Sequence, residues 1–350
     1  MTPPKILEMN RPGELFEREG AAAGSVCCVS CAHRCVIPDG GHGRCYLRVC
    51  REGKLLVPKG YVSALACDPV EKKPFYHFLP GSQALSFGML GCNFHCPFCQ
   101  NWSISQTMRD PHASERFRRC EAQEIVQMGV RSGVRSVCST YNEPLITTEW
   151  AVEIFRLARA AGMKTSYVSN GFGSPEVLEY LFACLDAMNV DLKCFREESY
   201  RALGGRLQPV LDTIRQLREE GKWVEVITLV VPGFNDSDEE LRDIAEFLAG
   251  TDPDIPWHLS AYHADYRYAD SVERWTPSET ILRAMRIGTR AGLRFVYAGN
   301  LRSAGEGGNT HCPDCGTRLI RRTGFHLAEN RLSSAGHCPN CNAEIPGVWD

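Results

Sequence analysis

Cysteine spacing is the feature that most constrains what this chain can fold into. The sequence has 18 cysteines in 350 residues, and most of them fall into three clusters, at 27–45, 92–99 and 312–341. Neighbours within these clusters are often separated by two or three intervening residues, a spacing typical of metal ligands. The start of the chain shows no apolar stretch followed by a small-residue cleavage site, as a secretory signal would. We therefore expect a metal-binding protein of a reducing compartment, the cytoplasm, and not a disulfide-bonded secreted protein.

Composition narrows the class further. Hydrophobic residues make up 43% of the chain, which suits a protein with a sizeable core. The formal net charge is -3, so no basic excess favours nucleic acid as a partner. We see no apolar run long enough to span a bilayer, so no membrane partner is expected either.

Strand-like and helix-like segments alternate between the second and third cysteine clusters. The expected strands are 84–90, 134–139, 164–168, 187–192, 223–231, 257–261 and 294–297. The expected helices are 121–132, 147–161, 175–183, 208–220, 236–249 and 278–291. This alternation predicts an α/β fold of parallel strands with right-handed crossovers, either a barrel or partial barrel or a doubly wound open sheet. In both cases the functional groups should lie at the carboxyl ends of the strands.

The central cysteines, Cys92, Cys96 and Cys99, directly follow the first of these strands. Three thiolates can ligate only three irons of a four-iron cluster, whereas a cluster used only for electron transfer normally takes four cysteines. The fourth iron would remain open for chemistry. Gly88 and Gly91 would let the backbone bend around such a cluster. A zinc ion held by the three thiolates and His95 is the alternative.

The pattern Cys-x3-Cys-x2-Cys, with Phe98 before its last cysteine, resembles that of the radical S-adenosylmethionine (SAM) superfamily. The resemblance implies an enzyme with a partial (β/α)6-type barrel and a [4Fe-4S] cluster whose fourth iron binds SAM. It implies reductive cleavage of SAM to methionine and a 5'-deoxyadenosyl radical, which abstracts hydrogen from a substrate. It also implies that Cys92, Cys96 and Cys99 are the catalytic cluster ligands and that Phe98 packs on the adenine.

Later strand ends carry residues that the same resemblance assigns to SAM binding. They are Glu143, Asn170, Asp191, Lys193 and His263. A carboxylate suits an ammonium or a ribose diol, and a lysine suits a carboxylate. Each residue has an ordinary alternative, such as a plain salt bridge between Asp191 and Lys193. Tyr141 and Asn142 stand where the superfamily usually has two glycines.

The chain as a whole is similar to one subgroup, the radical SAM enzymes of the AmmeMemoRadiSam system, which are relatives of pyruvate formate-lyase-activating enzyme. The segments that carry this similarity are Asp68–Pro74, His77–Ser82, Gly91–Trp102 and Pro346–Trp349. It implies SAM and an electron donor such as flavodoxin or ferredoxin as partners, with Memo-like and AMMECR-type proteins as further candidates. The substrate stays open between a partner protein that receives a glycyl radical and a small molecule. A non-enzymatic zinc protein that binds other molecules is the alternative from another class.

Two further cysteine sets flank the predicted barrel. The C-terminal set, Cys312, Cys315, Cys338 and Cys341, has the paired Cys-x2-Cys pattern of a zinc ribbon, with an auxiliary iron–sulfur cluster as the rival. The N-terminal set is Cys28, Cys31, Cys35 and Cys45, with Cys27 as a possible substitute for Cys28. It could hold zinc or a second four-iron cluster that relays electrons, and we favour zinc.

These sets divide the chain into three expected parts. They are a cysteine-rich metal-binding segment at 1–80, a barrel at 81–305 and a zinc ribbon at 306–350. The remaining cysteines should be small buried residues. Cys138 and Cys194 lie near strand ends, so a catalytic thiol is possible at either of them.

Overall fold

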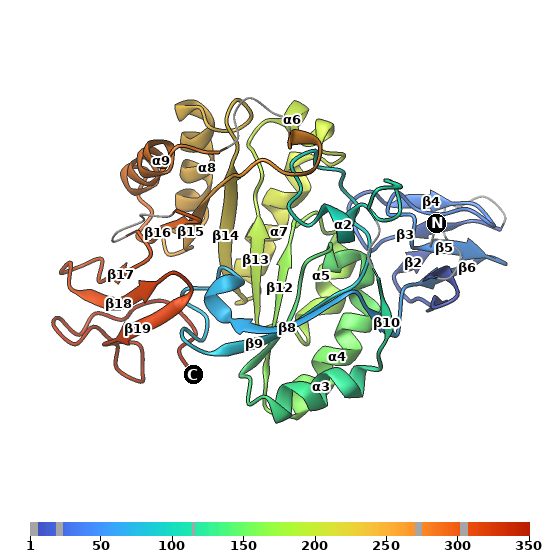
Figure 1. Ribbon diagram of the computed structural model, residues 1–350, viewed down its shortest axis with the longest axis horizontal. Helices are drawn as coiled ribbons and strands as arrows, with labels where there is room; N and C mark the ends of the chain where they lie inside the picture. The colour runs from blue at the N-terminus through green and yellow to red at the C-terminus, as the bar shows by residue number, and fades with distance from the viewer. Residues whose placement is uncertain (1–5, 19–23, 114–115, 270–274, 302–306) are drawn as a thin grey trace.

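The computed structural model describes residues 6–18, 24–113, 116–269, 275–301 and 307–350. The boundary predicted between residues 305 and 306 lies outside these ranges. Three parts follow one another along the longest axis of the molecule, with the small N-terminal and C-terminal sheets at opposite ends of a large central sheet (Figure 1).

The central sheet has eight strands in the order β16-β15-β14-β13-β12-β11-β9-β8. Its parallel strands are β9 (Gln83–Gly88), β11 (Ser136–Ser139), β12 (Lys164–Ser169), β13 (Ala187–Asp191), β14 (Trp223–Val230), β15 (Trp257–Ala261) and β16 (Val296–Gly299). The crossover helices are α3 (Ala122–Arg131), α4 (Thr148–Ala160), α5 (Pro175–Phe182), α7 (Leu207–Glu219), α8 (Asp238–Thr251) and α9 (Ser278–Arg290). Each predicted strand and helix is present, with bounds that differ by a few residues.

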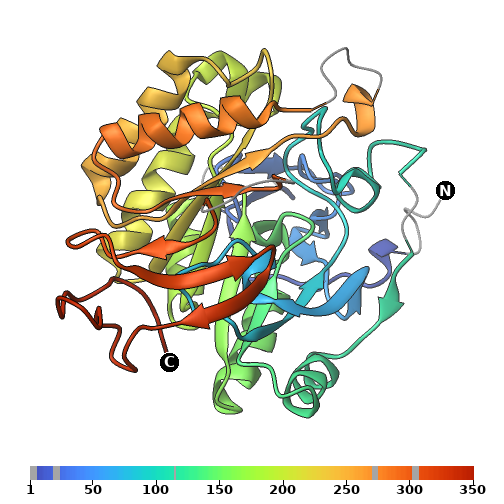
Figure 2. The same cartoon turned by 60° about the vertical axis from the view of Figure 1, so that its left-hand side comes forward.

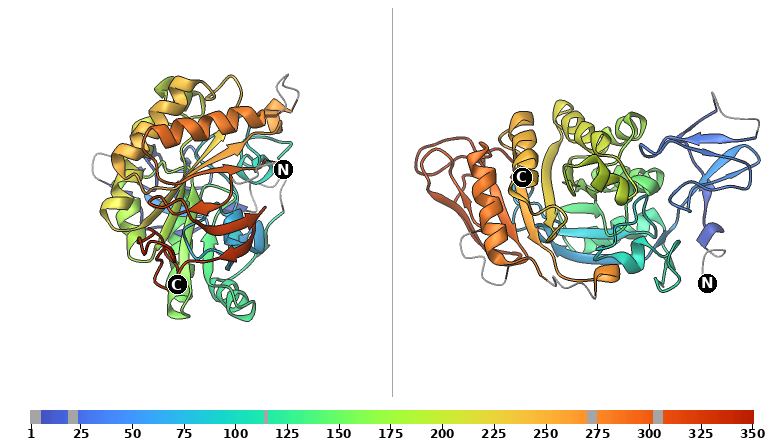
Figure 3. Two further views of the ribbon diagram at one scale, coloured as in Figure 1. Left: turned by 90° about the vertical axis from the view of Figure 1, so that its left-hand side faces the viewer. Right: turned by 90° about the horizontal axis from the view of Figure 1, so that it is seen from above.

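Consecutive parallel strands are neighbours in this sheet, so every crossover moves one place in the same direction. Right-handed crossovers then put all the helices on one face, and the views along two axes show them there (Figure 3). The prediction of an α/β fold with a mostly parallel sheet is confirmed, and the doubly wound alternative is wrong because such a fold covers both faces with helices. The central sheet has seven parallel strands, whereas the expected partial barrel has six β/α units. Closure into such a barrel therefore stays a prediction.

Strand β8 (Ala64–Pro69) is an element that the sequence analysis did not predict. It pairs antiparallel with β9 over its whole length, from Ala64 opposite Gly88 to Pro69 opposite Gln83. A 3-10 turn, Val70–Lys72, follows it. Residues 64–69 therefore belong to the central sheet, although the expected N-terminal segment extended to residue 80.

The N-terminal part consists of short antiparallel strands. One small sheet is β2 (Phe16–Glu17), β3 (Val26–Cys28) and β4 (Cys35–Ile37), and another is β1 (Arg11–Pro12), β6 (Lys54–Val57) and β5 (Val49–Arg51). A pair is formed by β7 (Tyr61–Val62) and β10 (Arg118–Arg119). Buried Arg48 joins this part to α4 through a two-pronged ion pair with Glu149, at 2.6 and 2.7 Å.

The C-terminal part is a three-stranded sheet of β17 (Thr310–His311), β18 (Arg318–Thr323) and β19 (His326–Asn330), seen from the front in Figure 2. It is fastened to the segment before β9. Val348 forms a parallel bridge with Phe78, and His77 Nδ1 lies 2.7 Å from the Pro346 carbonyl oxygen. The Tyr297 hydroxyl lies 2.6 Å from His77 Nε2.

The His77 contacts fix the protonation of its ring. A carbonyl oxygen can only accept, so Nδ1 carries the hydrogen and Nε2 accepts from Tyr297. Burial lowers the pKa of His77 to about 4, which agrees with a neutral ring. Within the described residues, no helix has both the length and the apolar character needed to cross a membrane.

Candidate active site

The loop that carries the central cysteines begins where β9 ends. Gly88 and Gly91 are required there: a Cβ on Gly88 would lie 2.6 Å from the Thr140 carbonyl oxygen, and Gly91 has a φ of +87°. The loop is also held from its far side. Phe94 lies so close to Gly205 that a Cβ on that glycine would overlap the phenyl ring. The backbone nitrogen of His95 donates to the Leu203 carbonyl oxygen.

The thiols of Cys92, Cys96 and Cys99 line one cavity together. Burial raises the pKa of all three, to about 12 for Cys96. Without a metal they would therefore stay protonated at neutral pH, and a bound cation would supply the charge that makes them thiolates. The chemistry of this donor set, three buried or half-buried sulfurs and no fourth cysteine among the residues that line the cavity, fits a four-iron cluster with one open iron.

His95 does not complete a zinc site with these thiols. Its Nδ1 lies 2.9 Å from the Leu203 carbonyl oxygen. The ring lines a different cavity, beside Arg44 and Arg109. Among the described residues, the three thiols and His95 do not form a group of ligand atoms at the mutual distances of a single-ion site. His95 is therefore not placed to be the fourth ligand of a zinc ion bound by Cys92, Cys96 and Cys99.

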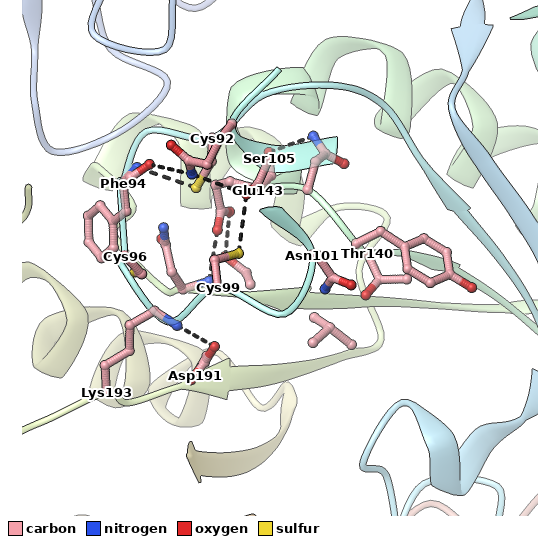
Figure 4. A pocket seen from close by; sticks show the side chains of 16 residues that line it. Cys92, Phe94, Cys96, Cys99, Asn101, Ser105, Thr140, Glu143, Asp191 and Lys193 are labelled. Atoms are coloured by element: carbon pink, nitrogen blue, oxygen red, sulfur yellow. Dashed lines mark hydrogen bonds and ion pairs between the residues drawn. The ribbon is translucent and has the colours of Figure 1, made fainter. Parts of the chain in front are cut away.

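Two adjoining cavities of about 580 and 670 Å³ open at the carboxyl ends of the strands, and Figure 4 shows the side chains that line the first. Cys96, Cys99, Asn101, Asp191 and Lys193 line both. The first also contains Cys92, Glu143 and Asn170, which come from three neighbouring strand ends. The second extends over Phe98 toward Ile227, Leu229 and Ser260. Groups far apart in the sequence therefore meet beside the cysteine loop.

Glu143 follows β11 and is buried beneath the first cavity. Its carboxylate accepts hydrogen bonds from Ser169 Oγ at 2.7 Å, the Asn170 nitrogen at 2.8 Å and the Leu145 nitrogen at 3.0 Å. Burial raises its pKa to about 7, and these donors oppose that rise. The carboxyl group can therefore change its protonation state near neutral pH.

Asp191 and Lys193 form an ion pair of 2.5 Å at the end of β13, where both line the two cavities. Burial lowers the pKa of Lys193, but the charges of Asp191 and of Cys96 outweigh this and raise it. Lys193 is thus a permanent positive charge next to the cysteine loop. Asn235, from the segment after β14, holds this turn by donating to the Lys193 carbonyl oxygen at 2.7 Å.

Tyr141 occupies a position where the resemblance expects glycine, and its φ of +74° is one that glycine adopts more readily. The side chain compensates for the strain. Its hydroxyl lies 3.1 Å from Lys73 Nζ, and the Lys73 ammonium lies 4.5 Å from the centre of the tyrosine ring. Lys73 also pairs with Asp68 at 2.9 Å. Tyr141 thus holds a backbone conformation that glycine adopts more readily.

Phe98 and His263 differ in where the structure puts them. Phe98 is buried, lines the second cavity and packs against Phe234 and Tyr268. His263 follows β15 but lines neither of the two cavities, and its ring packs on Trp275. Ser260, the next-to-last residue of β15, lines the second cavity instead.

The isolated cysteines are mostly buried, as expected, but Cys67 on β8 is exposed. Cys138 and Cys194 line neither cavity of the site. Burial raises the pKa of Cys138 to about 11 and that of Cys194 to about 12, so neither is a reactive thiolate at neutral pH.

Sequence reasoning missed two residues beside the thiols. Ser105, at the end of α2 (Trp102–Ser105), lies with its Oγ 3.2 Å from Cys99 Sγ. Asn93 is buried within the cysteine loop, and its Oδ1 accepts from Asn170 Nδ2 at 2.8 Å. The position of Asn93 between two cluster ligands was a usable signal, whereas nothing in the sequence marks Ser105.

The C-terminal cysteines come together as the ribbon pattern predicted. Cys312, Cys315, Cys338 and Cys341 form a group whose sulfur atoms all lie within 4.8 Å of one another. Sγ of Cys312 lies 3.6 Å from that of Cys341, and Sγ of Cys315 lies 3.7 Å from that of Cys338. Four thiolates at about 2.3 Å around a tetrahedral zinc ion would lie about 3.8 Å apart. The group can therefore hold a metal ion, and zinc stays a prediction.

Comparisons with known proteins give matches that include the loop of Cys92, Cys96 and Cys99. The sequence profile of the Radical SAM superfamily matches residues 88–248. The protein MJ0808 of Methanocaldococcus jannaschii is 37% identical over 321 residues, which are 91% of this chain and 94% of that protein. The matched profile begins at Gly88 and includes the cysteine loop, Glu143, Asn170, Asp191 and Lys193.

Two relatives with named activities are more distant. The pyruvate formate-lyase-activating enzyme of Listeria monocytogenes is 28% identical over 179 residues, which are 48% of this chain and 70% of that enzyme. A GTP 3',8-cyclase of the same species is 26% identical over 264 residues, which are 71% of this chain and 76% of the cyclase.

Proposed function

The chain belongs to the radical SAM superfamily, and we propose that it is an enzyme that cleaves SAM reductively and abstracts hydrogen from a substrate. Cys92, Cys96 and Cys99 would hold a [4Fe-4S] cluster. When bound, the cluster and SAM supply an electron transfer that yields methionine and a 5'-deoxyadenosyl radical. The observation that carries the proposal is the meeting of three buried or half-buried thiols, a buried carboxylate and a half-buried ion pair at adjoining cavities.

The side chains around the cavities suit the parts of SAM. Glu143, when ionised, can pair with the ammonium of the methionine part, and the three donors to its oxygens keep it in place. The charge of Lys193 suits a carboxylate, and Asp191 suits the ribose hydroxyls. Phe98 offers an apolar surface for the adenine in the second cavity. Asn170, which lines the first cavity, positions both Glu143 and Asn93.

His263 would have to turn toward the second cavity to bind the nucleoside. Its ring lies against Trp275 instead. Ser260 and Leu229 already line that cavity and can take its place at the edge of the adenosine site. We therefore keep His263 in the proposal as a peripheral residue, and assign the nearer contact to Ser260.

Two classes of substrate follow from the relatives. Similarity to a pyruvate formate-lyase-activating enzyme supports a partner protein as the hydrogen donor, by glycyl-radical activation. Similarity to a GTP 3',8-cyclase supports a small molecule instead. The AmmeMemoRadiSam subgroup, with Memo-like and AMMECR-type partners, is proposed from the motifs at 68–74, 77–82, 91–102 and 346–349. The electron would come from a protein such as flavodoxin or ferredoxin.

The reaction class is tested by reconstituting the protein with iron and sulfide without oxygen, then adding dithionite and SAM. Formation of 5'-deoxyadenosine and methionine is expected. Cys96→Ala should reduce the rate at least 100-fold, because the cluster would keep only two protein ligands. Cys120→Ala, which changes another buried cysteine away from the cavities, is the matched control and should keep the wild-type rate. A Cys96→Ala protein that forms 5'-deoxyadenosine at the normal rate would contradict the assignment.

A further inference from the structure

The N-terminal cysteines form a group of their own next to the proposed active site. Cys28 on β3 and Cys35 on β4 are directly opposite in the antiparallel pair, so their side chains share one face. The Arg44 nitrogen lies 3.5 Å from Cys35 Sγ, which brings Cys45 to the same place. A charge on Cys28 would act on the thiols of Cys31, Cys35 and Cys45. Cys27 lies on the other face of β3, with its thiol directed to the Arg34 carbonyl oxygen.

The spacing of these four thiols differs from that in the ribbon. The ribbon sulfurs lie at distances that suit one zinc ion. Throughout the described residues, by contrast, no three of the sulfurs of Cys28, Cys31, Cys35 and Cys45 lie within 4.8 Å of one another. The thiols of the central loop are held apart in the same way. A cubane of four irons and four sulfides separates its ligands more widely than a single ion does, so the wider spacing favours a cluster.

The surroundings of the group also suit an anionic cluster. Arg48 Nε lies 3.2 Å from Cys28 Sγ, and the Arg44 nitrogen points to Cys35 Sγ. Arg48 is itself buried and is fixed by Glu149. Donors of this kind stabilise charged sulfur and tune the potential of an iron–sulfur cluster.

Asn93 connects this group to the central loop. It follows Cys92 directly, and its Oδ1 lies 3.7 Å from Cys92 Sγ. Its amide nitrogen is buried and makes no normal hydrogen bond in the described part of the chain, yet it lies close enough to Cys31 to lower the pKa of that thiol. A buried donor without a partner is costly, and a sulfur of a cluster would give it an acceptor. His33 Nε2, two residues after Cys31, lies 3.2 Å from the Asn93 carbonyl oxygen.

We propose that Cys28, Cys31, Cys35 and Cys45 ligate a second [4Fe-4S] cluster, which passes electrons to the central cluster across Asn93. This reverses the zinc assignment favoured from the sequence. The relay rests on the proposed function, because it needs the cluster at Cys92, Cys96 and Cys99 as its acceptor. The ligation itself does not depend on that function.

The proposed step is an electron transfer that makes and breaks no bond. A one-electron protein donor of low potential, such as reduced flavodoxin or ferredoxin, is oxidised as the N-terminal cluster is reduced. That cluster is reoxidised when it gives the same electron to the central cluster. One buried side chain, that of Asn93, lies between the two groups of thiols, and this contact supports direct transfer from the N-terminal cluster to the central one.

Metal analysis of the wild-type protein, reconstituted without oxygen, gives the first test. We expect about eight irons, eight sulfides and one zinc per chain if both clusters form. About four irons and two zinc ions would overturn the proposal, because the N-terminal group would then hold zinc. This measurement needs no variant, so poor folding of a variant cannot obscure it.

Paired variants separate the two cluster sites. A Cys92→Ala, Cys96→Ala, Cys99→Ala triple variant should keep about four irons per chain, held by the N-terminal group. Cys28→Ser should lose about four irons, while its neighbour Cys27→Ser should lose none. A Cys27→Ser protein that lost iron equally would contradict the assignment of Cys28.

The relay is tested by electron paramagnetic resonance of the dithionite-reduced protein. Two reduced clusters that are close neighbours broaden each other's signal, so the wild-type spectrum should differ from the sum of the spectra of the triple variant and of Cys28→Ser. A spectrum equal to that sum would contradict the relay but not the ligation. If wild-type protein held two clusters yet formed no 5'-deoxyadenosine, the proposed function would fail while the second cluster stood.

Discussion

At the scale of single residues, the most informative group is a carboxyl group in an unusual state. Glu143 is buried, accepts three hydrogen bonds and has a pKa raised to about 7 by burial. Its ordinary pKa would leave it ionised throughout the neutral range. The site can therefore lose one negative charge when the pH falls only slightly.

This predicts a pH-dependent affinity for SAM. Only the ionised carboxylate can pair with an ammonium, so the dissociation constant of SAM should rise about tenfold per pH unit once the pH is well below about 7. Glu143→Gln should bind SAM weakly and show a flat profile over the same range. Equilibrium dialysis of the reconstituted protein at several pH values measures both. An unchanged wild-type affinity from about pH 8 to about pH 6 would contradict the role of Glu143.

Sequence reasoning identified the residues of the site better than their surroundings. The thiols, Glu143, Asn170, Asp191 and Lys193 stand at strand ends, so the order of strands and motifs was enough to group them. The position of Asn93 between two cluster ligands was a usable signal, but its link to the N-terminal part was not predictable, because it depends on a contact with a residue 60 positions earlier. His263 follows a strand as expected, but the packing of its ring on Trp275 has no signature in the sequence.

At the scale of elements, a second buried carboxylate fixes the opposite end of the sheet. Glu225 on β14 is fully buried and accepts from the backbone nitrogens of Tyr76 and His77, at 2.9 and 2.8 Å. Trp223 Nε1 donates to it at 3.0 Å, and His258 Nε2 on β15 lies 2.6 Å away. Burial alone would raise the pKa of Glu225, but the bond and charge of His258 outweigh it and lower the pKa.

Removing this charge should destabilise the protein. Glu225→Gln puts an amide among four donors, and we expect the free energy of unfolding to fall by roughly 2–4 kcal/mol. Because the pKa is lowered, the stabilisation is present above the ordinary pKa of a glutamate and is lost as the pH falls through the folded-state value. Urea unfolding at neutral pH measures the loss.

The exposed residue Glu279, paired with Arg286, offers a matched control for this substitution. Glu279→Gln should change the free energy of unfolding by less than about 1 kcal/mol. Equal losses in the two variants would show that Glu225 contributes no more than a surface charge.

The elements that were predicted share a clear physical signal. The crossover helices and parallel strands alternate with regular spacing, so their order followed from the sequence within a few residues at each end. Strand β8 lacked such a signal, since its residues are mostly partly exposed and it ends in a proline. An edge strand is stabilised by its pairing partner, which a local pattern cannot reveal.

At the scale of the whole molecule, the C-terminal sheet packs against the segment that precedes the central sheet's strand β9. Arg322 is buried, donates to the Tyr76 carbonyl oxygen at 2.7 Å and lies 4.1 Å from the centre of the Tyr76 ring. The C-terminal segment pairs with residues 77–79. The part of the molecule that carries the cysteine group therefore packs against the segment that leads into β9, at whose end the active-site loop begins.

Loss of the metal from this cysteine group should lower the stability of the protein. Cys312→Ala should lose one zinc per chain and keep its iron, because the remaining three thiolates bind zinc more weakly. Its melting temperature should fall, since metal binding contributes folding free energy. Cys184→Ala, at another buried cysteine, is the control and should keep its zinc. Loss of iron instead of zinc would assign an auxiliary cluster to the ribbon.

The contact between His77 and Pro346 joins positions that are 269 residues apart. Closing so long a loop has a large entropic cost, so this contact should form late, after the sheet between the two positions has assembled. During synthesis, His77 leaves the ribosome long before its acceptor does. In the nascent chain, the end of the sheet near His77 must therefore remain without this contact until residue 346 has emerged.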